Sequence, residues 1–152
     1  MRAKAENRFE SCRRARRRAL QALYQWHLTG QDVGEILNQF HEEQDFSKVD
    51  TDLFTTLVRK VSGGQTEIDE KIKPFLDRPL KQLDVIEHVI LSIGAYELLH
   101  NIEVPHQVVI DEAINLAKQF GAQGSHSFIN GVLDKAAKQL RNFSSLSPLN
   151  PG

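Results

Sequence analysis

Apolar residues recur at intervals of three and four along most of the chain, and this spacing constrains the fold more than any other feature. It is the period of an α-helix that buries one face, whereas no stretch shows the alternation with period two that a half-buried strand requires. At 152 residues and 40% hydrophobic composition, the chain can bury one core or two small ones. We therefore predict an all-α fold of about seven helices in two small bundles.

Breaking and capping residues divide the chain into these helices. Gly30 ends a first helix, and the pair at 63–64 ends a third. The residues expected to begin later helices are Asp50, Thr66, Asp84 with Glu87 in a capping box, Pro105 and Ser125. Pro, Gly and polar residues between about 62 and 81 favour a passage between bundles. We predict a mobile basic arm over 1–12, bundles over 13–78 and 79–142, and a disordered tail over 143–152.

Arginines are concentrated at the start of the first predicted helix, where Arg13, Arg14, Arg16, Arg17 and Arg18 precede an apolar stripe. On a helical wheel, most of these guanidinium groups lie away from the stripe that Ala15, Ala19 and Leu23 begin. Guanidinium is planar, permanently charged and suited to phosphate, so the cluster indicates a nucleic-acid contact. A solvated basic helix face is the alternative reading.

Charge is unevenly distributed, although the net charge is only −1. Residues 1–18 carry eight basic and two acidic side chains, or +6, and the remainder carries −7. A basic end on an acidic body attracts a polyanion in a defined orientation, and a partner with a basic surface can use the acidic part.

Catalytic motifs are not evident in the sequence. Cys12 is the single cysteine, which excludes an internal disulfide and a cysteine-based zinc site. His41 begins like a zinc-protease helix, but Asp45 stands where the second histidine is needed. We find no phosphate loop, dinucleotide fingerprint, signal peptide or membrane span. We expect a cytoplasmic protein that is not an enzyme and needs no metal or cofactor.

Three motifs in matching order resemble the NusB family of bacterial transcription antitermination proteins. They are the arginine-rich segment that continues to Tyr24 and Trp26, the segment from Arg78 to Leu98, and the segment from Val104 through Asp134. The resemblance covers about residues 13–141. It implies two helical bundles that bind the single-stranded boxA element of ribosomal RNA leader transcripts together with the ribosomal protein NusE. It also implies assembly with RNA polymerase and other Nus factors.

The same resemblance assigns binding roles to individual residues. It places RNA contacts on the first helix at Arg13, Arg14, Arg16, Arg17 and Gln21, and at the start of the last helix at Ser125, His126 and Phe128. It adds Phe75 as an aromatic near RNA, and it implies that Tyr24 and Glu87 face NusE. The chain departs from the family pattern at Gln123, Gly124 and Ser127, so we expect the fine contacts at that loop to differ.

Purely structural roles remain open as alternatives for several of these residues. By periodicity alone, Phe128 is a core residue like Val132, Glu87 is an acid at a helix start, and Tyr24 is core. A purely protein-binding scaffold and an accessory domain of an RNA methyltransferase system are the alternative functions. The oligomeric state of the free protein, monomer or homodimer, is likewise open.

Overall fold

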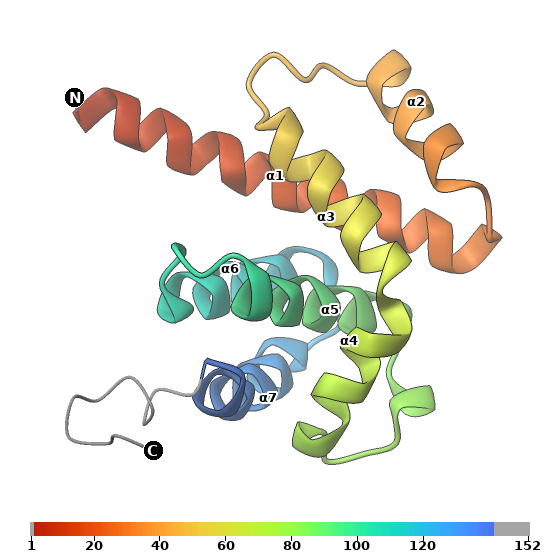
Figure 1. Ribbon diagram of the computed structural model, residues 1–152, viewed down its shortest axis with the longest axis vertical. Coiled ribbons are helices and arrows are strands. Elements are labelled where there is room, and N and C mark those ends of the chain that lie inside the picture. Colours follow the sequence, from red (N-terminus) through yellow and green to blue (C-terminus); the bar gives the residue numbers. More distant parts are fainter. Residues whose placement is uncertain (1, 142–152) are drawn as a thin grey trace. The chain divides into compact units, whose positions relative to one another are not determined.

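The computed structural model describes residues 2–141, and in this range the secondary structure consists only of helices (Figure 1). The predicted all-α class is confirmed. The chain divides into two compact units, Met1–Gln65 and Thr66–Gly152. This division lies inside the predicted passage at 62–81 but before the predicted boundary at 78/79, so that nearly all of the fourth helix belongs to the second unit. The predicted tail at 143–152 lies outside the described residues.

The first unit is built from α1 (Arg2–Thr29), α2 (Val33–Glu43) and α3 (Thr51–Gly63). α1 packs against α3 and, less extensively, against α2 (Figure 1). Asp32 and Asp50 cap α2 and α3 as side-chain acceptors of backbone N–H groups, as predicted for Asp50. α1 ends at Thr29, and Gly30 follows it with a φ of 67°, a left-handed conformation that glycine adopts at little cost.

An aromatic cluster fills the space between α2, α3 and the loop that joins them. The Phe40 and Phe54 rings stack with centroids 6.0 Å apart, and Phe46 meets Phe54 edge-on at 4.9 Å. His41, which resembled a zinc ligand in the sequence, packs its ring against Phe46 at 4.3 Å instead. The cluster holds the α2–α3 loop in place beside α1.

α1 starts at Arg2, although a mobile arm was predicted for 1–12. The prediction relied on apolar periodicity, which this segment lacks. Its Ala, Arg, Lys and Glu residues have high intrinsic helix propensity, so they can extend a helix that is already anchored farther along. A backbone hydrogen bond of 3.1 Å from the N–H of Asp50 to the carbonyl of Ser11 also fastens the extension to α3.

The second unit contains α4 (Gln65–Ile72), two short 3-10 helices η1 (Lys73–Phe75) and η2 (Leu80–Gln82), then α5 (Val85–His100), α6 (His106–Phe120) and α7 (Ser125–Leu140). α5 packs against both α6 and α7, and it is buried on nearly every side. Its Gly94 allows a close crossing, because a Cβ there would lie 2.9 Å from a Leu133 methyl. The prediction that this helix is largely buried is confirmed.

Three predicted helix starts differ in detail. α4 begins one residue before Thr66, which therefore is not its cap. Pro105 precedes α6, whose first residue is His106, rather than standing in its first turn. Gly124, with a φ of 84°, occupies the cap position of α7 in place of Ser125. The left-handed turn at glycine positions the chain without a capping side chain, and this leaves the Ser125 hydroxyl for another bond.

Arg141 joins the end of α7 to the end of α5. Its guanidinium donates hydrogen bonds of 2.6 to 3.2 Å to four backbone carbonyls, those of Glu97, Leu98, Asn101 and Val104. Burial lowers the pKa of Arg141. The last turn of a helix leaves carbonyls without intrahelical partners, so this side chain completes the end of α5.

Candidate nucleic-acid interface

The arginines of α1 differ in accessibility. Arg13, Arg14 and Arg17 are half-buried, whereas Arg16 is only 4% exposed. The difference follows from the helical period, because Arg16 lies on the same face as the buried Leu20 and Leu23. Three of the four predicted guanidinium groups are therefore accessible to a ligand, and the fourth is part of the protein interior.

Arg13, Arg17 and Gln21 follow one another at intervals of four residues and form a stripe along α1. Arg13 is 3.8 Å from a Glu10 carboxylate oxygen, and its guanidinium lies 5.6 Å from the Phe9 ring centroid. Gln21 is exposed. We call these three residues the α1 stripe; it combines two cations with an amide that can hydrogen-bond to a base or a sugar.

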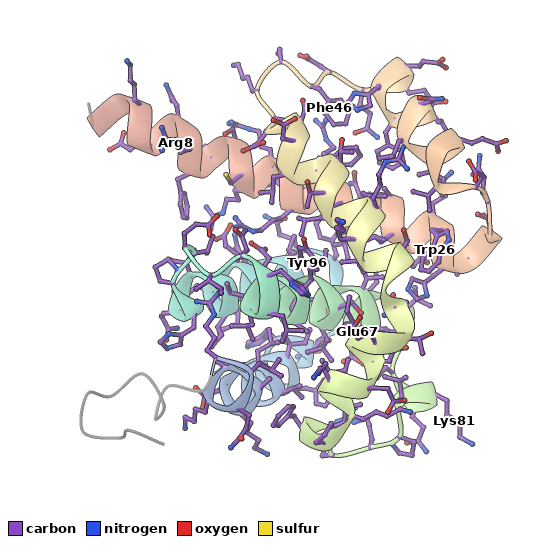
Figure 2. The ribbon with its side chains drawn as sticks, viewed as in Figure 1. Arg8, Trp26, Phe46, Glu67, Lys81 and Tyr96 are labelled. Atoms are coloured by element: carbon purple, nitrogen blue, oxygen red, sulfur yellow. The ribbon has the colours of Figure 1, made fainter. Side chains whose placement is uncertain are left out.

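Arg14 and Arg18 turn toward the α2–α3 loop. Arg14 Nη1 donates to the carbonyl of Lys48 at 3.4 Å, and Arg18 Nη1 donates to the carbonyl of Asp45 at 3.0 Å. The Arg18 guanidinium also lies 5.1 Å from the Phe46 ring centroid (Phe46 is labelled in Figure 2). The arginine cluster is evident in the sequence, whereas the role of these two side chains in fixing a loop is not.

At the start of α7, Ser125 is buried and His126 and Phe128 are half-buried. The Ser125 hydroxyl donates a 2.7 Å hydrogen bond to Glu87 Oε2 on α5. Ser125 is 4% exposed and Glu87 8% exposed. The resemblance implied that one of these residues contacts RNA and the other NusE, whereas in the structure they contact each other.

The predicted capping box at the start of α5 is half formed. Asp84 Oδ1 accepts a 2.7 Å bond from the backbone N–H of Glu87, which is the cap. In a complete capping box the Asp84 N–H would donate to the Glu87 carboxylate; here that carboxylate accepts the Ser125 hydroxyl instead. Glu87 is therefore an acid in the first turn of α5, as periodicity alone predicts, and its carboxylate also links α5 to α7.

Phe128 carries a guanidinium on its ring. Arg78 Cζ lies 4.0 Å from the Phe128 ring centroid, and Arg78 Nε donates to Asp77 Oδ1 at 2.8 Å. The Asp77 carboxylate raises the pKa of Arg78, and Arg78 lowers the pKa of Asp77. Arg78 stands in the sequence only as part of a family motif, and its separation of fifty residues from Phe128 gives no signal of this contact.

The other predicted residues are placed as follows. Phe75 is half-buried in η1, which packs against α7, so both predicted aromatics belong to one region of the second unit. Tyr24 is 38% exposed on α1, so it is a surface residue rather than core. At the loop where the chain departs from the family pattern, Gln123, Gly124 and Ser127 are exposed.

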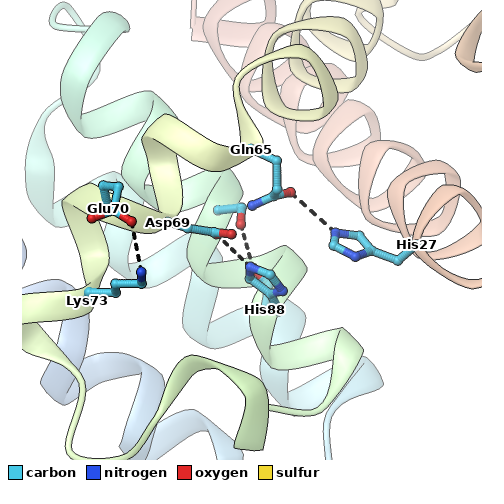
Figure 3. A network of polar contacts seen from close by, with 7 residues as sticks. His27, Gln65, Asp69, Glu70, Lys73 and His88 are labelled. Carbon is cyan, nitrogen blue, oxygen red and sulfur yellow. Dashed lines mark hydrogen bonds and ion pairs between the residues drawn. The ribbon is translucent and has the colours of Figure 1, made fainter.

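The histidines take part in ordinary polar contacts. His88 Nε2 lies 2.7 Å from Asp69 Oδ1 in the second unit, and His27 Nε2 lies 3.3 Å from Gln65 Oε1 in the first (Figure 3). Among residues 2–141, no three His, Cys, Asp or Glu side chains gather in a way that would hold a metal ion. Within that same range, the helices are too short or too polar to cross a membrane.

Comparisons with known proteins agree with the resemblance. The NusB family model matches residues 13–138. The transcription antitermination protein NusB of Idiomarina loihiensis is 52% identical over 129 residues, which span 85% of this chain and 93% of that protein. The protein of the same name from Alcanivorax borkumensis is 50% identical over 129 residues, 85% of this chain and 86% of the relative.

Two solved structures are also similar. NusB of T. maritima has a TM-score of 0.77 and 31% identity, covering 88% of this chain and 95% of its own. A crystal structure of the antitermination factors NusB and NusE in complex with dsRNA has a TM-score of 0.77 and 27% identity, covering 87% and 98%. The family model's span, residues 13–138, includes the α1 stripe and α7 as far as Lys138. By family model, sequence identity and fold, this chain belongs to the NusB family.

Proposed function

We propose that this chain is an RNA-binding transcription antitermination factor that recognises the boxA element of ribosomal RNA leaders together with NusE. The observation that carries the proposal is the α1 stripe: Arg13 and Arg17 are accessible on a helix whose other face is buried against α3. The backbone of this helix is already ordered, so phosphate binding has only the guanidinium side chains to order.

The start of α7 is the second proposed RNA surface. Phe128 and the Arg78 guanidinium over its ring form a platform, because both aromatic rings and guanidinium planes can stack on unpaired bases. His126, half-buried in the same first turn of α7, supplies a second ring. Ser125 has a positioning role here, since its hydroxyl bonds to Glu87 and so orients the first turn of α7. Arg16 similarly supports α1 from the buried side.

NusE is the proposed protein partner, as in the related complex that contains NusB, NusE and dsRNA. Tyr24 is the better candidate of the two predicted contacts, because its ring is exposed and a tyrosine suits the centre of an interface. Glu87 contributes through its bond to Ser125. The function needs no catalytic group, and a cytoplasmic protein that joins RNA polymerase and other Nus factors would fulfil it.

Binding to single-stranded RNA distinguishes this proposal from its competitors. Wild-type protein with NusE is titrated with boxA RNA, a scrambled RNA and a boxA duplex at several salt concentrations. The proposal expects boxA single strands to bind most tightly, and the affinity to fall with salt as phosphate contacts are lost. Equal affinity for all three RNAs would contradict it and would favour the scaffold function.

A further inference from the structure

A groove of about 580 Å³ runs between the N-terminal turns of α1 and the α2–α3 loop, wholly within the first unit. Three basic side chains line it: Arg8, labelled in Figure 2, Arg14 and Lys48. Polar side chains that can donate and accept hydrogen bonds stand between them, namely Asn7, Ser11 and Ser47. The volume is in the range of about 300–1,000 Å³ that is usual for small-ligand pockets.

The loop that forms one wall of this groove is held in place. The Asp50 N–H donates to the Ser11 carbonyl at 3.1 Å, and Arg14 donates to the Lys48 carbonyl at 3.4 Å. Asp45 Oδ1 accepts a 2.8 Å bond from the N–H of Ser47, and this backbone hydrogen bond lowers the pKa of Asp45. A wall fixed by these three hydrogen bonds is preorganised, so a ligand need not order it.

The charge of the groove favours an anion. Arg8 and Lys48 are exposed, and Arg14 is half-buried with its charge directed at the loop. Glu10 is the one carboxylate among the residues that line the groove, and it lies 3.8 Å from Arg13. Asp45 is not among the lining residues, but its carboxylate interacts electrostatically with Lys48. Three cations against these two carboxylates leave the groove with a net positive charge.

We propose that this groove binds the sugar–phosphate backbone of RNA nucleotides adjacent to the boxA element. Arg14 and Arg13 are neighbours on α1, about 100° apart around the helix axis, so a strand that crosses the helix meets the α1 stripe first and the groove next. The basic side chains take phosphates, and the serine and asparagine groups take ribose hydroxyls. This inference rests on the proposed function and extends its RNA path within the first unit.

The test compares a boxA RNA with the same RNA extended by a short oligouridine tail at either end. The groove variant is Arg8→Ala with Lys48→Ala, which keeps Arg14 and therefore the loop. The matched control is Arg59→Ala with Lys60→Ala, which removes two exposed cations from α3 outside the groove. Arg13→Ala with Arg17→Ala reports on the α1 stripe in the same titration, and circular dichroism shows whether each variant folds.

The proposal expects wild type and control to bind one of the extended RNAs about tenfold more tightly than boxA alone. The groove variant should lose that gain, with a salt slope lower by roughly 1.4 for two phosphates at ~0.7 each, while its affinity for boxA alone is unchanged. If the groove variant equals wild type on every RNA while the stripe variant binds weakly, the groove inference is wrong and the proposed function stands.

Two further outcomes overturn the inference for different reasons. If no RNA binds to wild type in the presence of NusE, the proposed function fails and the inference fails with it. If polyglutamate competes for the groove as well as the oligouridine tail does, the groove serves an acidic protein. Chemical shift changes of the Ser47 and Lys48 amides on adding the extended RNA, but not boxA alone, would support the proposal independently.

Discussion

α1 and α5 are the central helices of their units, and they use their surfaces in opposite ways. α1 buries one face and leaves the opposite side to charged residues, so that the middle of the helix can meet a ligand. α5 is buried around most of its circumference, and even its polar Glu87, Ser92 and Glu97 are covered. The comparison shows that α1 keeps one side open to solvent along its length, whereas α5 offers little surface of its own to a ligand.

The largest effect that would test this contrast is on stability, at the end of α5. Replacing Arg141 by Ala removes hydrogen bonds to four carbonyls, and charged hydrogen bonds contribute roughly 1.5–3 kcal/mol each without adding fully. We expect a loss of about 3 kcal/mol in the free energy of unfolding, measured in urea. Lys138→Ala, which removes only an exposed pair with Asp134, should change it by less than about 0.5 kcal/mol. Similar losses of unfolding free energy for the two variants would show that the Arg141 hydrogen bonds are dispensable.

The α1 stripe should give a comparable effect, but on binding instead of stability. Arg13→Ala with Arg17→Ala is expected to weaken boxA binding roughly hundredfold, or ~2.8 kcal/mol, if each contact contributes about tenfold. The unfolding midpoint should stay close to that of wild type, because both side chains lie on the partly exposed side of the helix. Filter binding across a salt series measures the affinity, with Arg59→Ala and Lys60→Ala as the control. If the double variant showed the same salt dependence as wild type, the exposed side of α1 would not be a phosphate-binding surface, and the contrast with α5 would have no bearing on RNA binding.

A smaller effect is expected where α5 crosses α7. Gly94→Ala places a methyl group 2.9 Å from Leu133, which is fully buried, and the crowding should cost about 1–2 kcal/mol. Gly131→Ala is the matched control on α7, since its Cβ would meet nothing within 4 Å. It should be neutral or stabilising by roughly 0.5–1 kcal/mol, as alanine favours the helix. Thermal unfolding of both variants would reveal whether close packing or helix propensity dominates here.

The smallest effect concerns the platform at the start of α7. Phe128→Leu keeps an apolar side chain but removes the stacking plane beneath Arg78, so single-stranded boxA should bind about fivefold to tenfold more weakly, or ~1 kcal/mol. Duplex RNA offers no unpaired base, and its affinity should not change. Equal losses with the two RNAs would indicate that Phe128 acts only as a packing residue.

Sequence reasoning was most successful where the signal is local. Periodicity and caps gave the helices of both units, including the Asp50 and Asp84 caps, because these depend on residues within a few positions of one another. The start of α1 was misjudged, since propensity rather than an apolar stripe extends that helix. The interior position of Arg16 follows from the same wheel as Leu20 and was available from the sequence.

The candidate site depends more on contacts between distant residues, and these gave no sequence signal. Arg78 reaches Phe128 across fifty positions, and Ser125 reaches Glu87 across thirty-eight. The family resemblance supplied residue roles, but it could not indicate that two of those residues bond to each other. Loop geometry is the third such case, because the contacts of Arg14 and Arg18 depend on how the α2–α3 connection is folded.

The bond between Ser125 and Glu87 has a consequence for how this protein can evolve. A hydroxyl and a carboxylate that bond to each other in a largely buried position are costly to replace singly, because either replacement leaves the other group without this partner. A substitution at one of the two positions should therefore be tolerated only with a compensating substitution at the other. We expect the two positions to covary among relatives, as a single inherited pair.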